Sequence, residues 1–146
     1  MPEPHLTDQD YQTLAAFRFA LRQFLTFSET AARDAGLTPR QHQALLGIKT
    51  AQNTGGASIA DLAGFLILHH NSTVELVDRL VRAGYVTRGD DTADRRRVRL
   101  SLTEQGEARL AVLSSIHLAE IERIGPELKN LLSMMEAASA KQVDLP

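Results

Sequence analysis

The sequence contains no cysteine, which excludes disulfides, thiolate zinc sites, thiol nucleophiles and cysteine-based redox sensors. No apolar run approaches the roughly 18–20 residues that a membrane span requires. The first ten residues, MPEPHLTDQD, lack the basic and apolar regions of a secretory signal. From these absences we expect a soluble cytoplasmic protein.

The chain has 146 residues, of which 43% are apolar, 5% aromatic and 23% charged. This composition is ordinary for a globular protein, and the length suits one domain. A chain of this size buries roughly 68–70% of its unfolded surface, so it can form a core without metal or crosslinks.

Positive charge is concentrated in one segment, although the whole chain has 16 basic and 18 acidic residues and a net charge of −2. The segment 79–99 holds three acids and seven arginines, which are Arg79, Arg82, Arg88, Arg95, Arg96, Arg97 and Arg99. A basic stripe on an otherwise acidic protein concentrates its field at one surface, as nucleic-acid binding requires. The alternative is a solvated charged face.

The first predicted helix begins at Thr7 and ends before Gly36. Its apolar residues recur at steps of three and four, and they are Tyr11, Leu14, Phe17, Leu21, Phe24, Leu25 and Phe27. This stripe is wider than a small domain needs for its own core, which indicates a partner helix across an interface. A central core helix is the alternative.

A capping box and an N-cap residue predict the starts of the next two helices. Thr38 and Gln41, with Pro39 at the first helical position, begin a helix that ends at 53–56. Ser58, followed by Asp61, begins a helix of two turns. We expect this helix to direct four apolar side chains inward, namely Ile59, Leu62, Ala63 and Phe65.

A fourth helix begins between His69 and Ser72 and ends at Gly84. Its apolar side is formed by Leu76, Val77, Leu80 and Val81. Residues 85–88 and 97–102 then have strand composition and flank a turn-rich stretch at 89–94, so they predict a hairpin with a charged tip.

The chain after the hairpin is predicted to form two more helices. Thr103 caps a fifth helix, and Gly125 with Pro126 is expected to break it. The sixth helix carries Leu128, Leu131, Leu132 and Met135. The predicted fold class is therefore mainly α with a small β-hairpin wing.

Two short helices joined by a tight turn and followed by a hairpin form a winged helix-turn-helix. Four stretches of the sequence then resemble the MarR family of bacterial transcriptional regulators. They are SIADLA at 58–63, STV with LVDRL at 72–80, GYVTR at 84–88 and, as the most specific, DRRRVRLSLTEQG at 94–106. The resemblance extends from about Asp8 to Ala138.

The resemblance implies a single MarR-type domain over residues 1–146. Residues 37–102 would bind DNA, and residues 7–36 and 103–141 would form the interlocking helices of a homodimer. Such dimers bind a pseudo-palindromic operator, commonly as repressors released by a small, often aromatic or phenolic, effector. A winged-helix module that contacts only proteins is the alternative function.

By the same resemblance the fourth helix is the recognition helix. Its groove-facing residues would be His69, His70, Asn71, Ser72, Thr73 and Glu75, with Arg79 as a phosphate contact or an ion-pair partner. Glu75 departs from the family, which often has a basic residue there, and a carboxylate is useful only if it accepts from a cytosine amine or orients an arginine. Ile67 departs too, because relatives often have a glycine or small residue in the turn. For Asp78 we expect an intramolecular ion pair from helix to wing.

The wing matches the family's Asp-x-Arg pattern at Asp94 and Arg96. The resemblance implies that the acid holds the loop and that the arginine enters the minor groove, whose negative potential suits a guanidinium. Arg95 and Arg97 would contact phosphates. Arg99 lies on the polar face of its strand, near the DNA backbone or paired with a carboxylate.

No enzymatic signature is present, so we predict that the chain is not an enzyme and holds no cofactor. Asp90 and Asp91 are adjacent in a turn and diverge, unlike paired catalytic carboxylates. His69 and His70 point about 100° apart on a helix, so no metal is predicted. His42 and His117 are candidates for an effector pocket, although ordinary surface or core histidines are the simpler interpretation.

Overall fold

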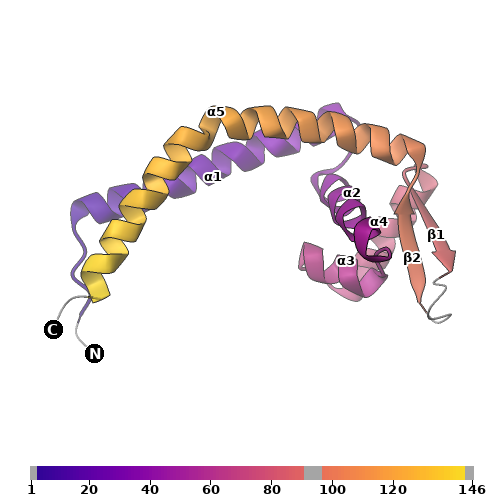
Figure 1. Cartoon of the computed structure of the whole chain (residues 1–146), viewed down its shortest axis with the longest axis horizontal. Coiled ribbons are helices and arrows are strands. Elements are labelled where there is room, and N and C mark those ends of the chain that lie inside the picture. Colours follow the sequence, from indigo (N-terminus) through magenta and orange to yellow (C-terminus); the bar gives the residue numbers. More distant parts are fainter. Residues whose placement is uncertain (1–2, 91–96, 144–146) are drawn as a thin grey trace. The chain divides into compact units, whose positions relative to one another are not determined.

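The computed structural model describes residues 3–90 and 97–143. In chain order its elements are α1 (Asp8–Asp34), α2 (Pro39–Ala51), a short 3-10 turn η1 (Gln52–Thr54), α3 (Ile59–Leu66), α4 (His70–Arg82), β1 (Val86–Asp90), β2 (Val98–Leu102) and α5 (Glu104–Val143) (Figure 1). They form two compact units. We call residues 29–116 the lobe, and residues up to 28 together with those from 117 onward the helical unit.

The lobe encloses the hydrophobic core. Its largest fully buried side chains come from α2, α3, α4, both strands and α5, and include Leu45 and Ile48 of α2, Leu62 of α3, Leu80 of α4 and Leu100 of β2. These residues are the apolar positions of the helical and strand periods in the sequence, so each element directs one face toward the same centre.

The predicted capping box is present, and the structure shows a second one at the predicted start of α3. The Thr38 hydroxyl accepts from the Gln41 backbone N–H at 3.1 Å, and the Gln41 side chain accepts from the Thr38 N–H at 2.9 Å. Ser58 and Asp61 make the same reciprocal pair, with both distances 3.1 Å. Each box satisfies two N–H groups that the first helical turn leaves without intrahelical partners.

The hairpin is antiparallel, and Val86 lies opposite Leu102 while Asp90 lies opposite Val98. Its second strand is joined to the core by the Leu100 N–H, which donates to the Ala57 carbonyl at 2.8 Å. At its end the Thr103 hydroxyl donates to the Gly84 carbonyl at 2.6 Å and accepts from the Gly106 N–H at 3.1 Å. Thr103 therefore caps α5 and ties its start to the end of α4.

Gly106 allows a close approach of backbone to backbone at this junction. A Cβ placed there would lie 2.2 Å from the Tyr85 carbonyl oxygen, well inside the contact distance of real atoms. Glycine is therefore required for α5 to start beside the hairpin.

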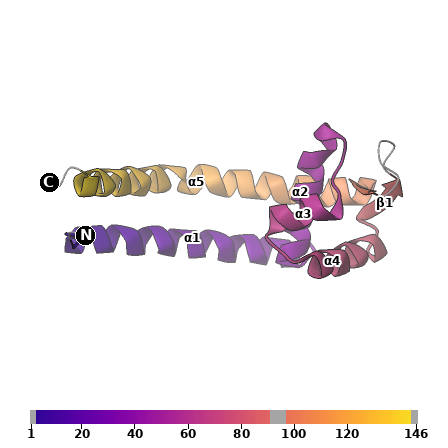
Figure 2. The same cartoon turned by 90° about the horizontal axis from the view of Figure 1, so that it is seen from below.

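The helical unit consists of the N-terminal part of α1 and the C-terminal part of α5, which run side by side (Figures 1 and 2). The prediction of a break at Gly125 and Pro126 was wrong, because α5 continues to Val143 with Pro126 inside it. A proline removes one helical hydrogen bond but need not end a helix. Here Leu128 is half-buried and Leu131 is buried, although both follow the proline. Burial of apolar side chains after Pro126 favours one continuous helix.

The expectation that Phe65 points inward was also wrong, since 50% of this residue is exposed. The inward stripe of α3 is formed instead by Ile59, Leu62 and Leu66. The Phe65 ring lies at the side of that stripe, against Gly47 of α2, where an added Cβ would be 2.6 Å from the ring.

The fold class is confirmed as mainly helical, and the described residues form five α-helices and a two-stranded antiparallel wing. Within the described ranges, no helix combines the length and the apolar character that crossing a membrane would require.

Candidate nucleic-acid interface

A tight turn joins α3 to α4 and forms the helix-turn-helix. Ile67 ends α3 in the left-handed conformation, with φ 55° and ψ 49°, and the Leu68 N–H donates back to the Ala63 carbonyl at 3.0 Å. His69 then returns to extended backbone and precedes the first turn of α4. A β-branched residue rarely adopts a left-handed conformation, so the turn is strained at Ile67, which is 91% exposed.

Helix α4 has two distinct faces. Its buried face carries Leu76, Val77 and Leu80. Its exposed face carries most of the predicted contact residues, which are His69, His70, Asn71, Ser72, Glu75 and Arg79. The helix therefore attaches to the lobe through one side and presents the other, polar side to solvent.

Thr73 does not share the exposed face, although the sequence placed it among the groove-facing residues. The residue is 0% exposed, and its hydroxyl donates to the His69 carbonyl at 3.0 Å. This back-bond satisfies the hydroxyl inside the first turn of α4. Thr73 is thereby removed from the set of residues that could reach a ligand.

A groove lies between the start of α2 and the exposed face of α4. Its lining comprises Thr38, Pro39, Arg40, Leu68, Ser72, Glu75, Leu76 and Arg79. Two arginines, Arg40 from α2 and Arg79 from α4, thus share one depression with the carboxylate of Glu75. The mixture of hydroxyl, guanidinium and carboxylate groups suits a polar, hydrogen-bonding partner.

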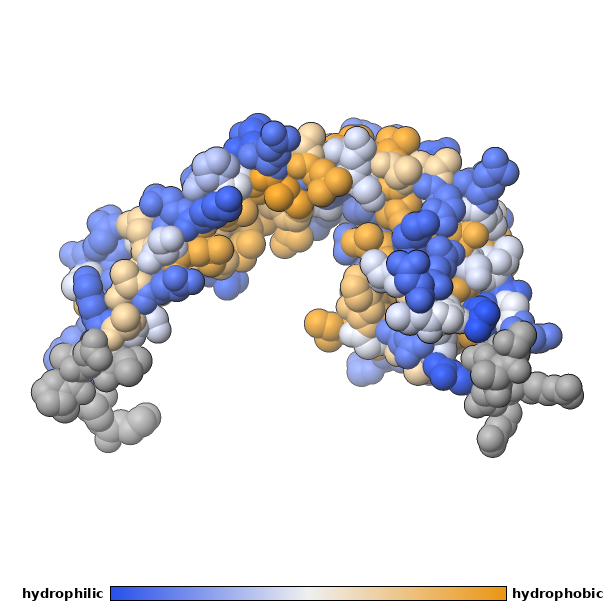
Figure 3. Space-filling view, viewed as in Figure 1, coloured by the Kyte–Doolittle hydropathy of each residue, from blue (hydrophilic) through white to orange (hydrophobic). Residues whose placement is uncertain are grey.

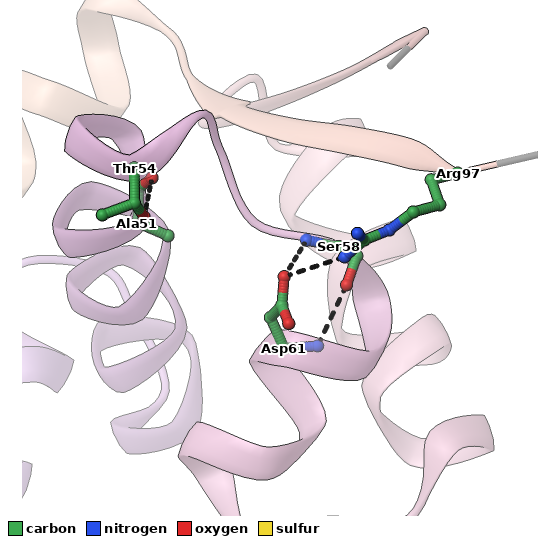
Figure 4. A network of polar contacts seen from close by, with 5 residues as sticks. All are labelled: Ala51, Thr54, Ser58, Asp61 and Arg97. Atoms are coloured by element: carbon green, nitrogen blue, oxygen red, sulfur yellow. Dashed lines mark hydrogen bonds and ion pairs between the residues drawn. The ribbon is translucent and has the colours of Figure 1, made fainter. Parts of the chain in front are cut away.

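At the base of the wing, Arg97 is tied to the start of α3. Its guanidinium lies 3.3 Å from the Asp61 carboxylate, which also caps α3 (Figure 4). The Ser58 backbone N–H, then its hydroxyl, and then the Arg97 charge hold the pKa of Asp61 below its usual value. Both side chains of the pair are about half exposed, so solvent weakens the attraction and Arg97 remains able to exchange Asp61 for another anion.

Arg99 is half-buried over the Gly55–Gly56 turn rather than extended from the wing. A Cβ at Gly56 would lie 2.6 Å from the Arg99 Cγ, and the Arg99 Nε is buried without a hydrogen-bond partner. In the described part of the chain Arg99 pairs with no carboxylate, so that predicted alternative is not found.

The ion pair expected for Asp78 is present. The Asp78 carboxylate of α4 accepts from the Arg88 guanidinium of β1. Sequence reasoning anticipated a pair from helix to wing but not its partner, because nothing local to Arg88 distinguishes it from the other arginines. Asp94, Arg95 and Arg96, the other predicted wing residues, lie outside the described residues.

The two candidate effector-site histidines belong to different units. His42, in the lobe, is 4% exposed. His117, in the helical unit, lies 2.7 Å from the Ser28 hydroxyl and edge-on to Phe24 and Phe27, with ring centroids 6.0 and 5.7 Å away. Among the described residues no cluster of three or more metal-ligating side chains occurs.

Comparison with known proteins shows which regulators the chain is similar to. The model of the MarR family matches residues 35–97, which span the helix-turn-helix and the start of the wing. The HTH-type transcriptional regulator YsmB of Bacillus subtilis is 28% identical over 70% of each chain. Over its helix-turn-helix the chain is therefore similar to MarR regulators. The same similarity supports the prediction of a transcriptional regulator rather than an enzyme.

Solved structures of MarR proteins have the same fold. One MarR family transcription regulator is 25% identical, covers 94% of this chain and 92% of its own, and gives a TM-score of 0.73. AbsC, a MarR regulator from Streptomyces coelicolor, gives the same TM-score at 22% identity over 92% and 93% of the two chains.

Proposed function

We propose that this protein is a dimeric, sequence-specific DNA-binding repressor that inserts α4 into the major groove and lays its wing along the backbone. The observation that carries the proposal is the exposed polar face of α4, which carries Arg79 and shares a groove with Arg40 of α2. Such side chains contact phosphates and base edges. A DNA regulator acts where the DNA lies, so we place it in the cytoplasm.

The predicted contact set is accordingly His69, His70, Asn71, Ser72, Glu75 and Arg79 on α4, with Arg97 at the wing base. Asp94, Arg95 and Arg96 keep the roles that the MarR resemblance implies. A mutant of MepR from Staphylococcus aureus, 22% identical with a TM-score of 0.65, was solved bound to an oligodeoxyribonucleotide. That complex supports DNA as the partner of this fold.

The dimer is proposed from the apolar surface of the helical unit. On α1 four exposed residues recur at spacings of three, seven and four, namely Tyr11, Leu14, Leu21 and Leu25. This spacing places them along one helix face, and Figure 3 shows hydrophobic side chains in a band along the unit. A symmetric dimer places two recognition helices about 34 Å apart, matching half-sites roughly 10 bp apart in a pseudo-palindromic operator.

Release by a small effector completes the proposal. CouR from Rhodococcus jostii RHA1, 21% identical with a TM-score of 0.68, was solved with p-coumaroyl-CoA. For this chain we propose an aromatic or phenolic effector, with His42 and His117 as the candidate contacts that the sequence offers.

Salt dependence separates DNA binding from a winged helix used only for protein contact. If a dimer neutralises about six to eight phosphates, the affinity for a duplex selected from a random library falls by roughly three to four orders of magnitude between 50 and 200 mM salt. A purified protein that selects no duplex at low salt would refute the proposal. An affinity that does not respond to salt would refute it as well.

A further inference from the structure

Glu75 places a carboxylate at the centre of the exposed face of α4. It is exposed, lies one turn after Ser72 and one turn before Arg79, and lines the same groove as Arg40. If α4 enters the major groove, this carboxylate enters with it. A negative charge there is repelled by the phosphates on both sides, so it lowers affinity unless it meets a hydrogen-bond donor.

The carboxylate is not used to orient either arginine. Within the described residues, Glu75 has no hydrogen bond to a side chain and no ion pair within 4.0 Å, although Arg40 and Arg79 share its groove. Of the two roles that the sequence left open, orientation of a neighbouring arginine is therefore not observed. The two guanidinium groups nevertheless reduce the cost of bringing a carboxylate close to DNA, because they partly neutralise the local field.

The donors in the major groove identify the base. Guanine and thymine present only acceptors and a methyl group at their major-groove edges, so both repel a carboxylate. Adenine presents its N6 amino group beside the N7 acceptor, whereas cytosine presents its N4 amino group without an adjacent acceptor on the same base. From this exposed carboxylate, which pairs with no side chain among the described residues, we infer that Glu75 reads cytosine by accepting from its N4 amino group.

This inference rests on the proposed function and deepens it. Glu75 is then a specificity-determining residue, and each half-site of the operator carries a C·G pair at the position that Glu75 faces. The residue contributes discrimination rather than general affinity. Its replacement by a neutral side chain therefore relaxes base preference while it strengthens binding to unrelated DNA.

The test is in vitro selection from a random duplex library with the parent protein, with Glu75→Gln and with Glu136→Gln. Glu136 is an exposed residue of α5, so its variant has the same change of charge outside α4. We expect the parent and Glu136→Gln to select a fixed C·G pair in both half-sites. Changing that pair to T·A lowers their affinity about tenfold or more, and lowers that of Glu75→Gln less than about threefold, because an amide can also pair with adenine.

The outcomes separate the two claims. Identical selected sequences for the parent and Glu75→Gln, or no shared cytosine in the sequences of the parent, overturn the role of Glu75 and leave DNA binding intact. Failure of every protein to select a duplex overturns the proposed function instead. Equal melting temperatures of the three proteins establish that the comparison reports on recognition rather than folding.

Discussion

The lobe and the helical unit differ in how they bury their apolar residues. Among the described residues, every buried apolar side chain except Leu131 lies in the lobe. The helical unit instead exposes ten large apolar side chains, which are Leu6, Tyr11, Leu14, Phe19, Leu21, Leu25, Leu118, Ile121, Leu132 and Met134. Large exposed apolar surfaces often mark interaction sites. The lobe thus has a core within one chain, whereas the helical unit leaves most of its large apolar side chains exposed, which is the basis of the proposed dimer.

The largest expected effect comes from charging the exposed stripe of α1. We predict that the double variant Leu21→Glu, Leu25→Glu has an association constant more than about 1000-fold weaker than the parent, because burial of each leucine contributes about 1.5–3 kcal/mol and each occurs twice in a dimer. Light scattering at micromolar concentration should give the 16.0 kDa mass of one chain for the variant and twice that mass for the parent.

The control for this change lies in the lobe. Ile67→Glu introduces one such charge at the most exposed large apolar residue among those described and should leave the dimer intact. A parent protein that is monomeric at micromolar concentration, or a double variant that dimerises like the parent, would contradict the difference drawn between the two units.

A second prediction concerns the packing of the lobe. Gly106→Ala should lower the free energy of unfolding by about 3 kcal/mol, because the added methyl group would collide with the Tyr85 carbonyl and rigid backbone cannot yield cheaply. Gly64→Ala is the matched control, since a Cβ there meets nothing within 4 Å and alanine favours a helix by about 1 kcal/mol. Urea unfolding measures both. Equal stabilities would show that α5 does not start as closely to the hairpin as described.

The smallest predicted effect is at the strained turn. Ile67→Gly should raise the free energy of unfolding by about 1 kcal/mol. The left-handed conformation costs isoleucine roughly 1–2 kcal/mol and costs glycine little. Part of this gain is lost because glycine gives the unfolded chain more conformational entropy. Ala60→Gly, at an exposed position within α3, should lower stability by about 1 kcal/mol. Thermal unfolding that ranks the two variants the other way would exclude strain at Ile67.

Local features of the fold could be predicted from the sequence. The starts of α2 and α3 were found because a capping box, as at Thr38 with Gln41, or an N-cap residue acts within one turn and satisfies backbone groups whatever surrounds it. The buried face of α4 was found because apolar residues at helical spacing must lie together. Both signals are complete within one turn or one helix.

Features that depend on distant residues could not be predicted. The Arg97 and Asp61 pair joins residues 36 apart, and Arg99 packs on a turn far from it in sequence. Thr73 is polar and close to the start of α4, yet its back-bond to His69 buries it. The continuity of α5 through Pro126 depends on the burial of apolar side chains along this helix, and this burial outweighs the local effect of proline.

The most direct test of the central claim is a hydroxyl-radical footprint of the parent protein on a duplex that it selects, at low salt. The account predicts two protected segments whose centres lie about 10 bp apart on one face of the duplex, since two copies of α4 would occupy successive major grooves. Protection of a single segment, or no protection on any duplex, would contradict it.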